Sequence, residues 1–154
     1  MRTGFLFASL LAAGLALPTG LALAQAHDHA AAGELSLTLN QGQKWQGDEN
    51  MLKGMDAIRT AITARQEAIR AGSLQPAEYA TLAGEIQAQV DFMVENCKLE
   101  PAADEQLHLV LGEVLNGVSA MEAGDAPQAG VETVVAALNS YGEHFEHPGW
   151  APIQ

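Results

Sequence analysis

Apolar residues recur every three or four positions in four stretches of the chain between residues 48 and 147. This spacing is the period of an amphipathic helix that buries one face. Four helices of about twenty residues with short connections pack most simply as an antiparallel bundle. The sequence therefore predicts an all-α fold, an up-down-up-down four-helix bundle. The apolar positions are Met51, Met55, Ile58, Ile62 and Ile69; Tyr79, Leu82, Ile86, Val90, Met93 and Cys97; Leu107, Leu111, Val114, Val118 and Met121; and Val131, Val134, Leu138, Tyr141 and Phe145.

Residues that favour helix ends separate these stretches. Asp48 suits the N-cap position of the first helix, and Pro76 suits the first position of the second. Gly124 is a residue type that commonly ends helices, as it would end the third. Asp125 with Gln128 has the spacing of a capping box and predicts the start of the fourth.

The first part of the chain predicts a signal peptide over residues 1–24. Arg2 supplies a positive start, an almost wholly apolar run follows, and residues 22–24 fit the small-x-small cleavage rule. We expect cleavage before Gln25 and export to the periplasm. No later apolar run approaches the roughly 20 residues that cross a bilayer, so we expect no membrane insertion after cleavage.

The segments on either side of the predicted bundle lack helical periodicity. Residues 25–47 predict a flexible N-terminal segment, and residues 148–154 predict a C-terminal tail. His27 and His29 form a short His-x-His pattern within the first segment. A pair of this kind in a solvated tail would bind a metal only loosely.

Composition and charge exclude several classes of function. The chain has 154 residues, enough for one domain, with 19 acidic and 7 basic residues and a net charge of −12. Loss of Arg2 with the signal peptide leaves 6 basic residues and a net charge of −13. Such a surface repels phosphate backbones and argues against nucleic-acid binding. The single cysteine excludes an internal disulfide, a thioredoxin-like centre and covalently attached c-type haem.

The predicted topology gathers sulfur and imidazole side chains at one end of the bundle. That end would hold the start of the first helix, the end of the second, the start of the third and the end of the fourth. The opposite end contains no histidine or cysteine. Thiolate, thioether and imidazole groups suit copper, zinc or haem iron. The residues gathered there are Met51, Met55, Met93, Cys97, His108, His144 and His147.

A single soft metal ion is one expectation for this end. Met55, Cys97 and His108 form a reasonable ligand set, and His147 lies where it can fold back over the same end. Each residue also has a structural interpretation: the methionine as core filling, the cysteine as a small buried apolar residue, and His108 as a partly buried residue at the edge of its stripe. Lys98 next to Cys97 would lower the pKa of the thiol.

Asn50 and Met51 near the start of the first helix, and the last helix up to His144, resemble the cytochrome b562 family within the cytochrome c′-like four-helix bundles. The resemblance covers most of residues 48–146 in architecture. Members of that family hold haem without covalent attachment, using a methionine of helix one and a histidine of helix four. The resemblance therefore implies Met51 and His144 as axial ligands of a b-type haem.

Together these patterns predict a small exported protein that binds a metal centre and is not an enzyme. Haem b for electron transfer and a copper ion for buffering or delivery are both open, with a redox or metal-delivery protein as the partner. The GxSxG, HExxH and phosphate-loop motifs are absent, and Glu105 with His108 gives one Glu-x-x-His pair, too few for a di-iron bundle. A cofactor-free interaction or structural module is the alternative function.

Overall fold

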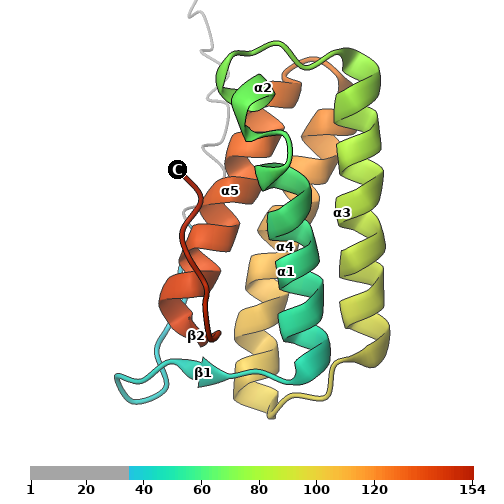
Figure 1. Cartoon of the computed structure of the whole chain (residues 1–154). Coiled ribbons are helices and arrows are strands. Elements are labelled where there is room, and N and C mark those ends of the chain that lie inside the picture. Colours follow the sequence, from blue (N-terminus) through green and yellow to red (C-terminus); the bar gives the residue numbers. More distant parts are fainter. Residues whose placement is uncertain (1–34) are drawn as a thin grey trace, which may run out of the picture. The chain divides into compact units, whose positions relative to one another are not determined.

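The structure, a computed structural model, describes residues 35–154. The predicted signal peptide, its cleavage point and the His27 and His29 pair lie outside the described residues. The described part is mainly helical, which confirms the all-α class. In chain order its elements (Figure 1) are β1 (Trp45–Gln46), α1 (Glu49–Thr63), α2 (Gln66–Arg70), α3 (Pro76–Asn96), α4 (Pro101–Ala123), α5 (Pro127–His144) and β2 (Phe145–Glu146).

Asp48 caps α1, as the sequence predicts. Its Oδ1 accepts a hydrogen bond from the Met51 N–H at 2.8 Å, which satisfies one of the free donors at the helix start. The first predicted stripe nevertheless spans two helices instead of one. α1 ends at Thr63, and the short α2 carries Ile69, the last buried residue of that stripe.

The break between α1 and α2 lies at Ala64 and Arg65. The Arg65 N–H donates to the Ile62 carbonyl at 3.0 Å, a tighter turn than that of an α-helix. The Ala61 carbonyl, which a continuous helix would pair with that N–H, accepts from the Arg65 guanidinium at 3.0 Å instead. The same guanidinium forms an ion pair with Glu85 of α3 at 2.8 Å. The side chain of Arg65 thus takes the place of a backbone hydrogen bond where α1 ends, and it connects this point to α3.

α3 begins at Pro76, as predicted, and its start is closed by a side chain. The Gln75 N–H donates to the Glu78 carboxylate at 2.8 Å, half of a capping box. The helix ends at Asn96. Cys97 therefore occupies the C-cap position in an extended conformation, one residue beyond the helix.

The connection between α4 and α5 is partly as expected. Gly124 ends α4 in the left-handed conformation, with φ 77°, which confirms its predicted role. The predicted capping box of Asp125 with Gln128 is wrong, because the N-cap residue of α5 is Ala126 and no side chain caps the helix. The Gln128 side chain accepts from the Tyr79 hydroxyl at 2.9 Å and so connects α5 to α3.

The predicted fourth helix ends earlier than its apolar stripe. Phe145 adopts an extended conformation, with φ −114° and ψ 141°, and starts β2. β2 pairs in parallel with β1, with Trp45 opposite Phe145 and Gln46 opposite Glu146. Phe145 is fully buried all the same. Its apolar position in the pattern therefore reflects burial rather than helix.

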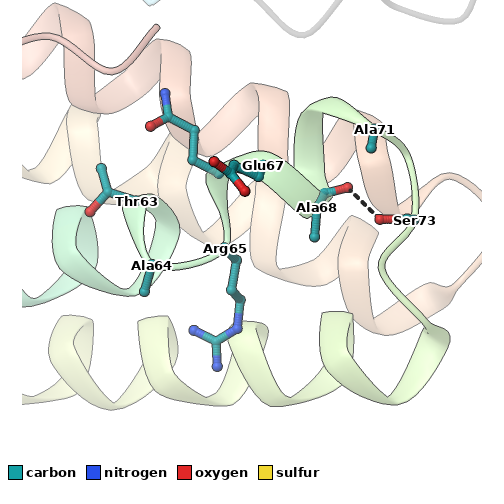
Figure 2. Close-up of a pocket in the computed structure, with 8 residues that line it drawn as sticks. Thr63, Ala64, Arg65, Glu67, Ala68, Ala71 and Ser73 are labelled. Atoms are coloured by element: carbon teal, nitrogen blue, oxygen red, sulfur yellow. Dashed lines mark hydrogen bonds between the residues drawn. The ribbon is translucent and has the colours of Figure 1, made fainter.

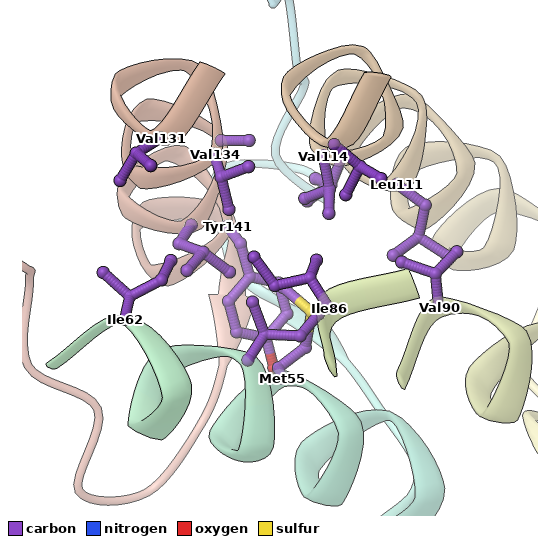
Figure 3. Close-up of a cluster of buried hydrophobic side chains, with 14 of the residues drawn as sticks. Met55, Ile62, Ile86, Val90, Leu111, Val114, Val131, Val134 and Tyr141 are labelled. Carbon is purple, nitrogen blue, oxygen red and sulfur yellow. The ribbon is translucent and has the colours of Figure 1, made fainter. Parts of the chain in front are cut away.

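Consecutive long helices pack against one another: α1 against α3, α3 against α4, and α4 against α5. The ends of these helices marked by Asp48, Asn96, Pro101 and His144 lie together beside β1 and β2 (Figure 1), and we call this region the strand end. Side chains from all four long helices form one buried cluster (Figure 3). Within residues 35–154, no helix has the length and apolar character needed to cross a membrane.

Candidate metal centre

Four sulfur-containing side chains lie near the strand end. Met51 and Met55 are one turn apart on α1, and Met93 and Cys97 are one turn apart on α3 and its C-cap. The three methionines are 0% exposed, and Cys97 is partly buried. The other described sulfur residue, Met121, belongs to the last turn of α4, away from the strand end.

Contacts between α1 and α3 set the relative height of these side chains. The Asn50 side-chain amide donates to the Asn96 carbonyl at 2.9 Å. One turn further along α1, Gly54 contacts the Met93 side chain so closely that a Cβ at Gly54 would lie 2.7 Å from Sδ. The first two turns of α1 therefore lie beside the last turn of α3. The two pairs of sulfur side chains consequently occupy the same level of the fold.

The Asp48 carboxylate connects both helices at this level. One oxygen caps α1, the other accepts the Lys98 N–H at 2.6 Å, and the Cys97 thiol also donates to this carboxylate. Partial burial raises the pKa of Asp48, but hydrogen bonds from the Met51 N–H, the Lys98 N–H and the thiol outweigh burial. The net pKa of Asp48 lies below its ordinary value.

The thiol of Cys97 is held in its protonated form. Burial is the largest cause of a raised pKa at Cys97, and together with the charge of Asp48, its hydrogen bond with the thiol and the charge of Asp104 it raises this pKa to about 12. The prediction that Lys98 would lower this pKa is wrong. Lys98 contributes its backbone N–H to Asp48, and the acidic groups around the thiol decide the direction of the shift.

His108 and His144 each bond to the preceding turn of their own helix. The His108 side chain is 64% exposed, its Nδ1 donates to the Asp104 carbonyl at 2.9 Å, and it lies 3.5 Å from the Asp104 carboxylate. His144 ends α5, and its Nδ1 donates to the Ser140 carbonyl at 2.8 Å. His108 therefore lies on the surface of α4, whereas Met55 and Cys97 belong to the interior level described above.

His147 folds back over the strand end, where it is 8% exposed. Its Nδ1 lies 2.9 Å from the Tyr141 hydroxyl, and its Nε2 lies 3.3 Å from the Asp56 carboxylate. A carboxylate oxygen can only accept, so Nε2 carries a proton and, in the neutral ring, Nδ1 accepts from the tyrosine. The side chain thereby joins α5 to α1.

The sequence pattern assigned no chemical role to Tyr141 or Asp56, the two partners of His147. Tyr141 appeared only as a core position, and Asp56 had no place in the pattern. A tyrosine on a buried stripe is itself a signal, because its hydroxyl needs a partner. Burial raises the pKa of Tyr141, and the charges of Asp56 and Cys97 raise it further. No comparable signal in the sequence identifies Asp56.

The arrangement does not fit the haem that the resemblance implies. Met51 is fully buried, and Gly47 contacts it so closely that a Cβ there would lie 2.8 Å from its Sδ. At the same end the rings of Tyr141 and Phe145 stack 5.1 Å apart. Neither Met51 nor His144 lines any cavity described for residues 35–154. A porphyrin requires a cavity of several hundred Å³ between its ligands.

The largest described cavity, about 680 Å³, lies at the turn between α1 and α2 (Figure 2). It is open to solvent and lies beyond Thr63, at the opposite end of α1 from Met51 and Met55. Its one basic side chain, Arg65, is paired with Glu85, and the Ser73 hydroxyl donates to the Ala68 carbonyl at 3.3 Å. Arg65 and Ser73, which line this cavity, are thus already partnered within the chain.

Among residues 35–154, no group of three or more histidine, cysteine, aspartate or glutamate side chains is arranged to hold a metal ion. Methionine thioether sulfurs also bind soft metal ions, and three of them lie near the strand end. Comparison of the chain with protein-family models, with curated proteins and with solved structures finds no match.

Proposed function

We propose that this chain is an exported, periplasmic protein that binds one soft metal ion, Cu(I) by its chemistry, at the strand end of an up-down-up-down four-helix bundle. The candidate ligands are Met51, Met55, Met93 and Cys97. Thioether and thiolate sulfur are the ligands that select Cu(I) among the common metal ions. In this proposal the chain buffers copper or delivers it to a partner protein and has no enzymatic activity.

One observation carries the proposal. Of the five sulfur side chains in residues 35–154, four lie on two adjacent turns of α1 and the last turn and C-cap of α3, at the same level. A methionine at a core position commonly only fills space. Here two pairs of sulfur side chains lie at the same level on neighbouring helices, and one pair includes the single cysteine. Filling space in the core would not require sulfur at all four positions.

Binding would exchange a proton for the metal ion at Cys97. The Sγ–H bond breaks, an Sγ–Cu bond forms, and the proton passes to water, so the oxidation states of sulfur and copper do not change. The Asp48 carboxylate, which accepts from the thiol, is the nearest group to receive the proton first. Thiol deprotonation makes soft-metal binding release protons.

Anaerobic titration of the reduced protein with Cu(I) against a competing chelator tests the proposal. We expect one bound ion per chain and a loss of affinity of at least about tenfold in Cys97→Ser. Met51→Leu, Met55→Leu and Met93→Leu remove the sulfur at nearly constant volume and should each weaken binding severalfold. Met121→Leu is the matched control, because Met121 is equally buried but lies outside the proposed site.

Two results would contradict the proposal. A protein that retains no Cu(I), with the same stability in the presence of a chelator, would favour the cofactor-free interaction module. An absorption band near the violet end of the visible spectrum that shifts on reduction would favour b-type haem. In that case Met51 and His144, rather than Cys97, would be the sensitive positions.

A further inference from the structure

Gly47 and Gly54 lie directly against two methionine side chains of the proposed site. At Gly54, an added Cβ would lie 2.5 Å from Cγ and 2.7 Å from Sδ of Met93. At Gly47, an added Cβ would lie 2.8 Å from Sδ of Met51, and closer still to its terminal methyl group. Atoms of a packed core do not approach one another this closely, so the two thioethers occupy the space that a side chain at either glycine would need.

The backbone does not require glycine at either position. Neither residue has a positive φ, the conformation that favours glycine, whereas Gly124 at the end of α4 has one. Gly54 lies inside α1, where alanine would favour the helix more than glycine does. What glycine provides at Gly47 and Gly54 is therefore the absence of a Cβ next to a thioether.

Closely packed glycines elsewhere in the described chain contact other kinds of group. At Gly117 and Gly130 the atom nearest to an added Cβ is a backbone carbonyl oxygen of the facing helix. Those two glycines let α4 and α5 come close. Gly47 and Gly54 differ from them because the neighbouring group in each case is a thioether, which has a metal chemistry of its own.

The cysteine of the site is held by a different kind of contact. The Cys97 thiol donates to the Asp48 carboxylate, and the residue is partly exposed. Thiolate and carboxylate both bind Zn(II), so these two side chains would offer a divalent ion two ligands. Among residues 35–154, no group of three histidine, cysteine, aspartate or glutamate side chains is placed to complete such a site. Discrimination between Cu(I) and Zn(II) would therefore depend on the thioethers.

We propose that Gly47 and Gly54 are positioning residues that make the sulfur site select Cu(I) over Zn(II). This inference rests on the proposed function. By lacking a Cβ, the two glycines leave the thioethers of Met51 and Met93 in the places that they occupy in this structure. Thioether sulfur binds Cu(I), whereas Zn(II) takes thiolate, imidazole and carboxylate ligands. A Cβ at either glycine displaces a thioether and so weakens the binding of Cu(I) alone.

Gly54→Ala tests this selectivity without changing any proposed ligand. Separate anaerobic titrations of the reduced protein with Cu(I) and with Zn(II), each against a competing chelator, measure the two affinities. We expect the affinity for Cu(I) to fall severalfold, to the level of Met93→Leu, and the weak affinity for Zn(II) to stay unchanged. Gly47→Ala should act in the same way through Met51. Because Gly47 precedes α1, this second variant introduces no change within a helix.

Double variants show whether each glycine acts through its methionine. Met93→Leu already lacks the sulfur, so addition of Gly54→Ala should cause no further loss of Cu(I) affinity. Gly47→Ala should likewise add nothing to Met51→Leu. Coupling of this kind between two positions in contact is what a double-mutant cycle measures.

Gly117→Ala is the matched control for both glycine variants. It places a methyl group against the backbone of α5, away from the proposed ligands, and should destabilise the fold. Its affinities for Cu(I) and Zn(II) should nevertheless equal those of the wild type. Gly112→Ala, with open space around it, controls for the change from glycine to alanine itself. Circular dichroism verifies the fold of every variant.

The outcomes separate the positioning role from the binding site. Equal losses of Cu(I) and Zn(II) affinity in Gly54→Ala, or a Cu(I) loss as large in Gly117→Ala, would overturn the positioning role, because the effect would then come from the fold. Unchanged Cu(I) affinity in folded Gly54→Ala and Gly47→Ala, or additive losses in the double variants, would also overturn it. The proposed function would stand in each of these cases. A wild-type protein that binds no Cu(I) would overturn both.

Discussion

At the residue scale, Asp48 shows how one side chain serves several purposes. Its carboxylate caps the N-terminus of α1 and accepts the N–H of Lys98, which follows α3. It also accepts a hydrogen bond from the thiol of Cys97. The first role is local and follows from the residue type and its position. The other two depend on α3 ending beside α1, and they set the protonation of the cysteine.

Replacement of Asp48 should reveal both kinds of contact. We expect Asp48→Ala to lower the free energy of unfolding by about 1–2 kcal/mol through loss of the cap, measured by urea denaturation at pH 7. Asp48→Asn keeps an oxygen acceptor and should lose less. Because the pKa of Asp48 is lowered in the fold, its charge stabilises the protein above the ordinary carboxyl pKa, and this contribution disappears as the pH falls. Asp48→Asn should therefore converge on the wild type in acid, whereas Asp48→Ala, which lacks the oxygen acceptor, stays less stable at every pH. A difference between Asp48→Asn and the wild type that does not change with pH would contradict the assignment.

The Cys97 thiol should react slowly at neutral pH. With the pKa raised from 9.0 to about 12, the thiolate fraction at pH 8 is about a thousandfold below that of an ordinary cysteine. The rate of alkylation by iodoacetamide should rise about tenfold per pH unit up to at least pH 10. Asp48→Asn, which removes a neighbouring negative charge, should accelerate the reaction. A rate that levels off near pH 9 in the folded protein would refute the raised pKa.

At the element scale, glycine positions decide how closely the helices approach. α4 and α5 touch through Gly117 and Gly130, where a Cβ on either residue would lie within 2.6 Å of the carbonyl oxygen of the other. The spacing of apolar residues predicts which faces of these helices meet. The distance between the helix axes depends on the absence of a Cβ at the two facing glycines. Thus the same residue type ends α4 at Gly124 and brings its backbone to α5 at Gly117.

Two glycine-to-alanine changes on α4 should have opposite effects. Gly117→Ala forces a methyl group against the backbone of α5 and should destabilise the fold by about 1–3 kcal/mol. Gly112→Ala has open space and should stabilise it by about 0.5–1 kcal/mol through helix propensity. Thermal or urea unfolding measures both. Equal effects of the two substitutions would show that propensity alone governs α4.

At the scale of the whole molecule, two groups that ordinarily titrate in alkali lie near the strand end, Tyr141 fully buried and Cys97 partly buried. The pKa values of Cys97 and Tyr141 are both raised, first by burial and then by neighbouring negative charge. In the unfolded chain these groups would lose their protons at lower pH. The native state therefore holds protons that the unfolded state has released, which links stability to pH.

The free energy of unfolding should accordingly fall as the pH rises above about 9, where the unfolded cysteine begins to ionise. The contribution of each group is fully present below its unfolded pKa and is lost as the pH rises toward its folded pKa. Cys97→Ala and Tyr141→Phe should each flatten the decline, as measured by urea denaturation between pH 7 and 11. A wild-type profile that stays level over this range would contradict the raised pKa values.

The local pattern of residues determined the helices of this protein. The apolar stripes identify the buried faces of α1, α3, α4 and α5, and Asp48, Pro76 and Gly124 mark three of the helix ends, because capping and periodic burial depend on neighbours within a turn or two. Phe145 shows what the apolar pattern cannot determine. A buried residue is apolar whether it lies in a helix or, as Phe145 does, in β2, so the pattern alone does not locate the end of α5. The break at Arg65 is likewise accompanied by an ion pair with Glu85, a partner on another helix that the local pattern does not identify.

Tertiary structure alone decided which chemical groups meet. His147 contacts Asp56 and Tyr141, while His108 lies on the surface of α4, and both outcomes depend on how each helix is rotated and where the chain runs after β2. A hydrogen bond requires its two atoms within about 3 Å, whereas the apolar pattern specifies only a face. The sulfur residues could therefore be assigned to one end from the sequence, but their burial, the protonated thiol and the contacts of the C-terminal segment with α1 required the packed chain.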